Sequence, residues 1–252
     1  MARFYESPAT VARLAARFGG CTPAAVYTSW YGETRGWRSP NQGWSIWNRW
    51  FRTDTDYIDP EEIAPATLGA IRNTLAAVQE SFDAPFVNKW QRNSARVEAL
   101  ARVFPEALFI WMKRRPEMVA QSILHGRREF LHDEGGWLSV APRHVDSIKG
   151  HSPLRQVCDQ VHYLEEDIRE YVAHVGAQRV LTVHYEEMCQ DPRKCLADIQ
   201  DFYDRAGVAG RLAARRDVPE RFDLRDNVKI GKDEFEEIRR YFSRSPGADG
   251  LE

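Results

Sequence analysis

The chain has 252 residues, of which 43% are hydrophobic and 29% are charged, and its formal net charge is −2. This is the composition of an ordinary globular protein, and the near-neutral charge argues against recruitment to nucleic acid by a general positive field. No apolar stretch approaches the roughly 20 residues that span a bilayer, and the first residues do not resemble a secretion signal. We therefore expect a single domain over residues 1–252, located in the cytoplasm, with no nucleic-acid or membrane partner.

The cysteines show no pattern typical of a metal site. The sequence contains no Cys-x-x-Cys pair, and no histidine lies at the spacing of zinc ligands. A cytoplasmic protein also keeps its thiols reduced. We expect no bound metal, and free thiols at Cys21, Cys158, Cys189 and Cys195.

The N-terminal part combines one predicted helix with an aromatic stretch. Apolar residues recur at helical spacing over 10–18, and two glycines would end that helix. Residues 27–57 are rich in aromatic side chains, which form either a satellite core or the wall of a cleft for an apolar or aromatic acceptor. Three of them share one helical face and are assigned to the core: Trp44, Trp47 and Phe51. Core and cleft stay equally open for three others, set among glycines and polar residues: Trp30, Tyr31 and Trp37.

The next elements predict two strands joined by a helix. A helix over 59–81 is followed by a short strand, 86–88, which delivers Lys89. A helix over 94–104 then leads to the apolar run 107–112, which suits a buried strand. Elements in this order form a right-handed crossover between parallel strands. The sequence thus predicts an α/β fold with a central parallel sheet flanked by helices.

A basic turn follows the second strand. Lys113, Arg114 and Arg115 are consecutive, and Pro116 suits the first position of the next helix. Helix N-terminal amides and guanidinium groups at the end of a parallel strand commonly bind anions. We interpret Arg114 and Ser122 as phosphate ligands; the alternative is a solvated basic edge with a surface serine.

The remaining elements are mostly helical. Residues 135–153 are irregular and are a candidate lid over the site. We expect a helix over 154–175, a strand over 179–184, and helices over 194–206 and 233–242. The apolar stripe of the first of these helices consists of Val157, Val161, Leu164, Ile168 and Val172.

The basic turn resembles that of the sulfotransferases that use 3'-phosphoadenosine 5'-phosphosulfate (PAPS). In that family a strand is followed by an Arg, a Pro two residues on and a Ser eight residues after the Arg, which here are Arg114, Pro116 and Ser122. The resemblance implies the family's P-loop-NTPase-like fold, with Arg114 and Ser122 holding the 3'-phosphate. Arg115 departs from the pattern, because an acidic residue is usual there. Lys229 and Lys232 resemble the basic C-terminal loop of some members, although the family's Arg-Lys-Gly motif is absent.

Other segments resemble the same family. Asn88-Lys89, with Phe104-Pro105 downstream, is similar to bacterial and tyrosylprotein sulfotransferases, and 31–35 resembles the Gly-Glu-Glu-Thr-Arg segment of the latter. Residues 185–192 resemble the segment that follows a core strand in many members.

These resemblances imply roles for three residues. Glu33 would be the catalytic base, Lys89 would neutralise charge on the leaving oxygen, and Tyr185 would contact the adenine. The alternative for Glu33 is a surface ion pair with Arg35 or Arg38. The alternative for Tyr185 is a buried aromatic residue that caps its strand.

One family feature is not recognisable. Members open with a strand and a loop of the kind Gly-x-x-Arg-Ser-Gly-Thr-Thr that binds the 5'-phosphosulfate, whereas the equivalent place here reads Glu6-Ser7-Pro8-Ala9-Thr10. Pro8 has no amide hydrogen to offer a phosphate, and the carboxylate of Glu6 would repel one. We expect either that the N-terminal strand and loop have been lost from this sequence, or that the protein does not turn over PAPS as its relatives do.

The resemblance implies transfer of a sulfuryl group from PAPS, as co-substrate and without a metal, to a hydroxyl or amine. The acceptor would be a small molecule or a peptide, with aromatic compounds among the candidates. The main alternative is a sulfotransferase-like protein that binds a nucleotide or an aromatic ligand without turnover. A P-loop kinase is a weaker alternative, because no Walker-type Gly-Lys-Ser/Thr is visible.

Overall fold

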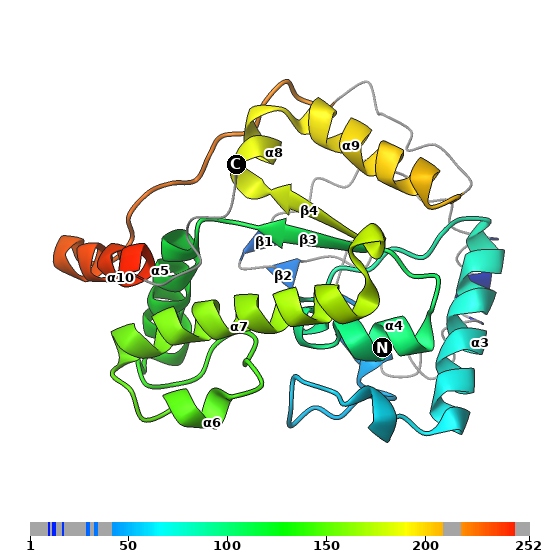
Figure 1. The fold of residues 1–252 in the computed structure, drawn as a ribbon, viewed down its shortest axis with the longest axis horizontal. Helices are drawn as coiled ribbons and strands as arrows, with labels where there is room; N and C mark the ends of the chain where they lie inside the picture. Colours follow the sequence, from blue (N-terminus) through cyan, green and yellow to red (C-terminus); the bar gives the residue numbers. More distant parts are fainter. Residues whose placement is uncertain are drawn as a thin grey trace. The chain divides into compact units, whose positions relative to one another are not determined.

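The computed structural model describes residues 42–208 and 218–244 and, before residue 42, only a few positions, namely Thr10, Ala12, Arg13, Arg17 and the backbone of 29–30 and 33–34. The predicted helix over 10–18 and the cleft candidates Trp30, Tyr31 and Trp37 therefore lie largely outside the described residues. The chain divides into two compact units, Met1–Pro105 and Glu106–Glu252. The predicted single domain stays a prediction, and Figure 1 shows the elements of the two units coloured along the sequence.

The first unit is mainly helical in the part that the structure describes. Strand β1 pairs with β2 in antiparallel orientation, with Trp30 opposite Glu33. The elements are β1 (Ser29–Trp30), β2 (Glu33–Thr34), α2 (Trp44–Trp47), η2 (Pro60–Glu62), α3 (Pro65–Phe82), η3 (Gln91–Ala95) and α4 (Val97–Val103).

Proline explains why the helix predicted over 59–81 begins later. Asp59 caps only a short 3₁₀ turn, in which its side chain accepts a hydrogen bond from the Glu61 amide at 2.8 Å. Pro65 has no amide hydrogen to continue a helix from that turn, but it suits the first position of a new one. The long helix α3 therefore runs from Pro65 to Phe82.

Two predictions for the first unit are wrong. Trp47 and Phe51 are buried and stack with 6.0 Å between ring centroids, but Trp44 is 58% exposed. Helix α2 ends at Trp47, so no continuous helical face joins 44 to 51. Residues 86–88 form no strand, because no described segment pairs with them.

The second unit contains a parallel pair of strands with helices around it. Strand β3 pairs with β4 in parallel, from Phe109 opposite Val180 to Lys113 opposite His184. The predicted α/β class with a parallel sheet is confirmed, but the predicted crossover from 86–88 is wrong, because the partner of β3 among the described residues is β4. The elements are β3 (Phe109–Lys113), α5 (Pro116–Gly126), η4 (Arg127–Leu131), α6 (Val145–Ile148), α7 (Pro153–Val175), η5 (Ala177–Arg179), β4 (Val180–His184), α8 (Tyr185–Gln190), α9 (Pro192–Arg205) and α10 (Lys232–Arg244).

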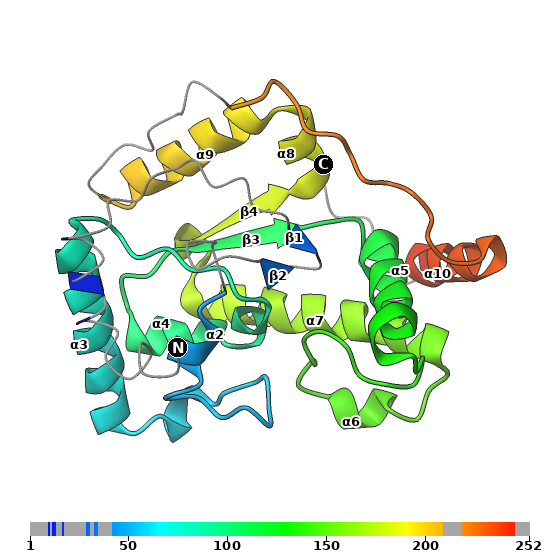
Figure 2. The ribbon, with the colours of Figure 1, turned by 180° about the vertical axis from the view of Figure 1, so that it is seen from behind.

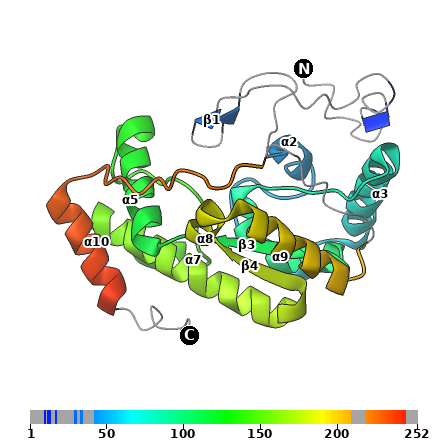
Figure 3. The same ribbon diagram turned by 90° about the horizontal axis from the view of Figure 1, so that it is seen from above.

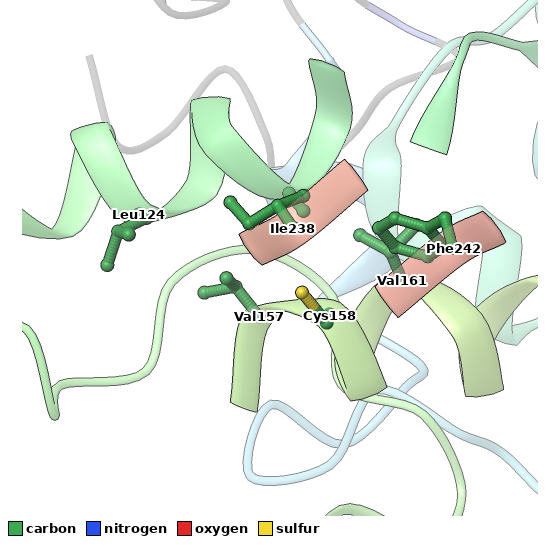
Figure 4. Packing of buried hydrophobic residues seen from close by; sticks show 7 residues of the cluster. Leu124, Val157, Cys158, Val161, Ile238 and Phe242 are labelled. Atoms are coloured by element: carbon green, nitrogen blue, oxygen red, sulfur yellow. The ribbon is translucent and has the colours of Figure 1, made fainter. Parts of the chain in front are cut away.

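The core of the second unit lies where α5, α7 and α10 meet (Figures 3 and 4). All three helices are amphipathic, and their apolar faces converge there. Helix α5 contributes Leu124 to this core, and the apolar stripe predicted on α7 contributes Val157 and Val161. The full cluster is Ala120, Leu124, Val157, Cys158, Val161, Ile238 and Phe242.

Among the helices that the structure describes, none is both long enough and apolar enough to cross a bilayer.

Candidate functional site

Arg114 and Tyr185 occupy equivalent places at the ends of the two parallel strands. Because Lys113 lies opposite His184, the next residue of each strand emerges at the same edge of the sheet. The Arg114 guanidinium lies over the Tyr185 ring, with 4.7 Å between Cζ and the ring centroid. The carboxyl edge of a parallel sheet is where open α/β folds bind ligands. The structure thus brings together two residues that the sequence predicts as nucleotide ligands.

Arg114 is the only base of the turn without a carboxylate partner among the described residues. Lys113 Nζ lies 3.6 Å from a Glu165 carboxylate oxygen. Arg115 Nε lies 3.7 Å from Glu186 Oε1, and the Arg115 amide donates to the same oxygen at 3.1 Å. Arg115, which departs from the family pattern, therefore has its charge offset locally. The uncompensated positive charge of the turn belongs to Arg114.

The guanidinium of Arg114 keeps one buried donor unused. Its Nη2 donates to the backbone oxygen of Arg225, whereas its Nε is buried and has no hydrogen-bond partner in the described part of the chain. A buried donor without a partner costs about 1–3 kcal/mol. A phosphate oxygen would satisfy such a donor through a charge-assisted hydrogen bond. The residues present therefore fit a nucleotide phosphate.

Ser122 offers a hydroxyl on the helix that follows the turn. It is half-buried on α5, and its hydroxyl has no hydrogen-bond partner among the described residues. Hydroxyls on helices often donate to the carbonyl four residues earlier, as Thr74 and Ser81 do on α3 at 2.7 and 2.6 Å. Ser122 does not do this, so its hydroxyl is available to a ligand. No hydrogen bond joins it directly to Arg114.

A segment near the C-terminal end of the described residues packs beside α5, the helix that carries Ser122. The sequence did not predict this position. We call residues 218–231 the strap; Figure 2 shows it running from beside α8 past α5 to α10. The carboxamide of Gln121, which is 2% exposed, donates to the Asn227 oxygen at 3.2 Å and accepts from the Lys229 amide at 3.0 Å. These bonds bring Lys229, a predicted candidate for a phosphate contact, to the residue that precedes Ser122. The only sequence signal for this contact is the glutamine beside Ser122. Its partner Lys229 lies 108 residues further along the chain, so no local pattern connects the two.

Tyr185 is half-buried at the first position of α8. Desolvation raises the pKa of its hydroxyl, and the nearby Arg114 charge opposes that shift. The hydroxyl is therefore neutral at physiological pH, and the ring serves as a flat surface beneath the guanidinium. Its predicted contact with adenine stays a prediction.

Lys89 belongs to the first unit and carries an unpaired charge. Its side chain is exposed, and no carboxylate pairs with it in the described part of that unit. Even so, enough protein surrounds the ammonium group to lower its pKa by desolvation. A lysine of this kind presents positive charge to solvent or to a ligand.

Glu33 belongs to β2 of the first unit. Its backbone pairs with that of Trp30. The side chain of Glu33 and residues 6–9 lie outside the described part of the chain, so the predicted catalytic role of Glu33 stays a prediction.

A comparison with protein families decides what kind of protein carries this arrangement. Residues 17–206, well over half of the chain, match the model of the sulfotransferase family. The chain belongs to the sulfotransferase family. No curated protein and no solved structure matches it. The matched region of this sulfotransferase includes all five predicted site residues, Glu33, Lys89, Arg114, Ser122 and Tyr185.

One cavity of the sulfotransferase's second unit is unsuited to a nucleotide. It is lined by residues of β4, α8 and α9. Four carboxylates line it against two bases, Lys194 and Arg205, so its net charge is negative and would repel a phosphate. The carboxylates are those of Glu187, Asp191, Asp198 and Asp201. The anion site is therefore better placed at Arg114.

The described part of this sulfotransferase offers no cluster of metal ligands. Within the described ranges, no group of three or more His, Cys, Asp or Glu side chains could hold a metal ion.

Proposed function

We propose that this sulfotransferase transfers a sulfuryl group from PAPS to a hydroxyl or amine of a small-molecule or peptide acceptor. The observation that carries the proposal is the Arg114 guanidinium, which lacks a carboxylate partner among the described residues and lies over Tyr185 at the carboxyl edge of β3 and β4. A guanidinium with a buried, unused donor at that edge suits a doubly charged phosphate.

Three residues of the second unit would hold the nucleotide. Arg114 would bind the 3'-phosphate through charge-assisted hydrogen bonds, and the Ser122 hydroxyl would donate another. Tyr185 would place its aromatic ring against the adenine while its other face supports Arg114. PAPS, when bound, supplies the activated sulfuryl group.

Two residues of the first unit would act on the reacting atoms. Glu33 would accept the proton of the acceptor as the acceptor's oxygen or nitrogen forms its bond to sulfur. Lys89 would neutralise the negative charge that develops on the phosphate oxygen as its bond to sulfur breaks. Little covalent help is needed for such a transfer, so positioning and charge stabilisation would supply most of the acceleration.

A second candidate is a protein of this family that binds the nucleotide without turnover. The observation that favours it is the sequence of residues 6–10, which contains no glycine and no base to bind the 5'-phosphosulfate. Arg114, Ser122 and Tyr185 would keep their roles in this case, because nucleotide binding alone requires them.

One experiment distinguishes the two candidates. The protein is titrated calorimetrically with adenosine 3',5'-bisphosphate and, as the control, with adenosine 5'-monophosphate. It is then incubated with PAPS labelled in the sulfuryl group and a panel of phenols, sugars and peptides. Preferential binding of the bisphosphate together with a labelled acceptor supports sulfuryl transfer. Binding without label transfer supports the second candidate, and equal or absent binding of both nucleotides contradicts both.

A further inference from the structure

Lys89 lies in a segment with no regular secondary structure. Residues 83–90 belong to no helix or strand, so no ladder of backbone hydrogen bonds fixes them. Exposure nevertheless alternates, since Phe86, Asn88 and Trp90 are half-buried while Val87 and Lys89 are exposed. Alternation of this kind is typical of extended backbone, which Trp90 adopts. The segment thus directs Asn88 inward and Lys89 outward.

The inward side chain of Asn88 makes three hydrogen bonds. Its Oδ1 accepts from Trp47 Nε1 at 3.0 Å and from Asn93 Nδ2 at 2.9 Å. Its Nδ2 donates to the Gln42 backbone oxygen at 3.1 Å. A carboxamide has two donor hydrogens and two acceptor lone pairs, so three of four possibilities are used. The partners come from both sides in sequence, and together they fix the backbone next to Lys89.

The partners of Asn88 are themselves held in place. Trp47 is buried and stacks on Phe51. Gly43 has a left-handed backbone, with φ of +68°, and a Cβ atom there would lie 3.2 Å from Asn88 Nδ2. Glycine suits this position for two reasons: it tolerates the positive φ, and it leaves space for the Asn88 carboxamide.

We propose that Asn88 is a positioning residue that places Lys89 for sulfuryl transfer. The inference rests on the proposed function, in which Lys89 stabilises the leaving oxygen. Lys89 has a flexible side chain, no carboxylate partner in the described part of its unit and no secondary structure to hold its backbone. The hydrogen bonds of the Asn88 side chain fix the backbone that carries Lys89. A displacement of the ammonium group by about 1 Å is enough to lower the rate by a large factor.

The test is a double-mutant cycle on the full chain. Asn88→Ala removes all three hydrogen bonds, and Lys89→Ala removes the ammonium group. Asn88→Ala should lower kcat about tenfold or more and leave KM for PAPS within about twofold. Combined with Lys89→Ala it should lower kcat no further, because Asn88 acts through Lys89. Val87→Ala, at a 78% exposed neighbour, is the control and should leave kcat unchanged.

A milder variant guards against loss of fold. Asn93→Ala leaves the buried indole of Trp47 in place and removes only one of the three hydrogen bonds of Asn88, so it should lower kcat by a smaller factor than Asn88→Ala. The inference is overturned if the effects of Asn88→Ala and Lys89→Ala multiply in the double variant, or if Asn88→Ala behaves like Val87→Ala. If Lys89→Ala itself leaves transfer unchanged, the catalytic role of Lys89 in the proposed function fails instead.

A readout without turnover completes the test. Reductive methylation with ¹³C places a probe on each lysine, and Lys89→Ala identifies the Lys89 resonance. Asn88→Ala should shift that resonance, and the pKa that it reports should rise toward that of a fully solvated lysine, because the ammonium group loses its fixed place beside the protein. An unchanged resonance and titration would overturn the inference, whether or not an acceptor is known.

Discussion

The Arg114 guanidinium lies 4.7 Å, measured from Cζ, from the centroid of the Tyr185 ring. The two residues are separated by 71 positions, and the register of two parallel strands places them together. Because Lys113 is opposite His184, the first residue beyond each strand reaches the same edge of the sheet. The strand pairing thus aligns a base and an aromatic ring where a nucleotide would bind.

Arg114→Ala should weaken binding of adenosine 3',5'-bisphosphate about tenfold or more. Charge-assisted hydrogen bonds contribute about 1.5–3 kcal/mol each, and 1.4 kcal/mol corresponds to a factor of ten. Calorimetric titration gives the dissociation constant. Arg115→Ala is the matched control and should change it less than about threefold, because Arg115 already pairs with Glu186. An unchanged constant in Arg114→Ala would remove Arg114 from the site.

Two substitutions at Tyr185 separate its ring from its hydroxyl. Tyr185→Phe keeps the surface on which Arg114 lies, so the affinity for the bisphosphate should stay within about twofold. Tyr185→Leu removes the cation–π contact, worth about 0.5–2 kcal/mol, and should weaken binding several-fold. The same titration measures both variants. Equal losses in the two variants would show that the hydroxyl, rather than the ring, matters.

Local patterns predicted the elements around this edge of the sheet. The apolar run before Lys113 and the proline at 116 correspond to β3 and the first position of α5. The spacing of Val157, Val161 and Ile168 corresponds to α7. Such patterns succeed because periodicity within one element reflects which face is buried.

Features that depend on distant contacts could not be predicted. The bonds between Gln121 and the strap join residues more than 100 positions apart, and no local pattern encodes them. Trp44 has the helical spacing of a core residue, but α2 ends three residues later and leaves it exposed. The predicted strand over 86–88 is replaced by a segment held through the side chain of Asn88.

The strap should loosen when its contact with α5 is removed. Gln121→Leu keeps a similar volume and eliminates both hydrogen bonds to the strap backbone. Hydrogen exchange should therefore accelerate at the Lys229 amide, which donates to Gln121 Oε1, while the amides within α7 keep their protection. Gln178→Leu, at an exposed glutamine, is the control. Unchanged exchange at Lys229 would mean that the strap is held by other contacts.

The pH dependence of kcat should show the titration of the Lys89 ammonium group. Desolvation lowers its pKa, so the ammonium group loses its proton at a lower pH than an ordinary lysine, whose pKa is about 10.4. If the protonated form stabilises the leaving oxygen, kcat should fall as pH rises through this lowered pKa and stay level below it. Lys89→Arg keeps its charge at high pH, so this alkaline fall should disappear from its profile. A profile that is the same for both proteins would assign the fall to another group.

Asp159 joins α10 to α7 through a buried carboxylate. It accepts hydrogen bonds from Tyr241 Oη and Arg155 Nε, both at 2.8 Å, and lies 2.7 Å from His151 Nδ1. Burial alone would favour the neutral acid, but these contacts hold the pKa of Asp159 below its usual value. A lowered carboxylate pKa stabilises the folded state above the unfolded value of about 3.9, and this stabilisation is lost as pH falls through the folded pKa.

Tyr241→Phe should therefore lower the free energy of unfolding by about 1 kcal/mol at pH 7, the usual contribution of one hydrogen bond. The difference from the unsubstituted protein should shrink at a pH below the lowered pKa of Asp159, where its carboxylate becomes protonated and the bond loses its charge assistance. Urea unfolding at the two pH values measures both free energies. Tyr203→Phe, at a tyrosine on α9 whose hydroxyl makes no hydrogen bond to the described residues, should change neither. A loss at pH 7 that persists undiminished in acid would show that Tyr241 stabilises α10 through packing of its ring and not through Asp159.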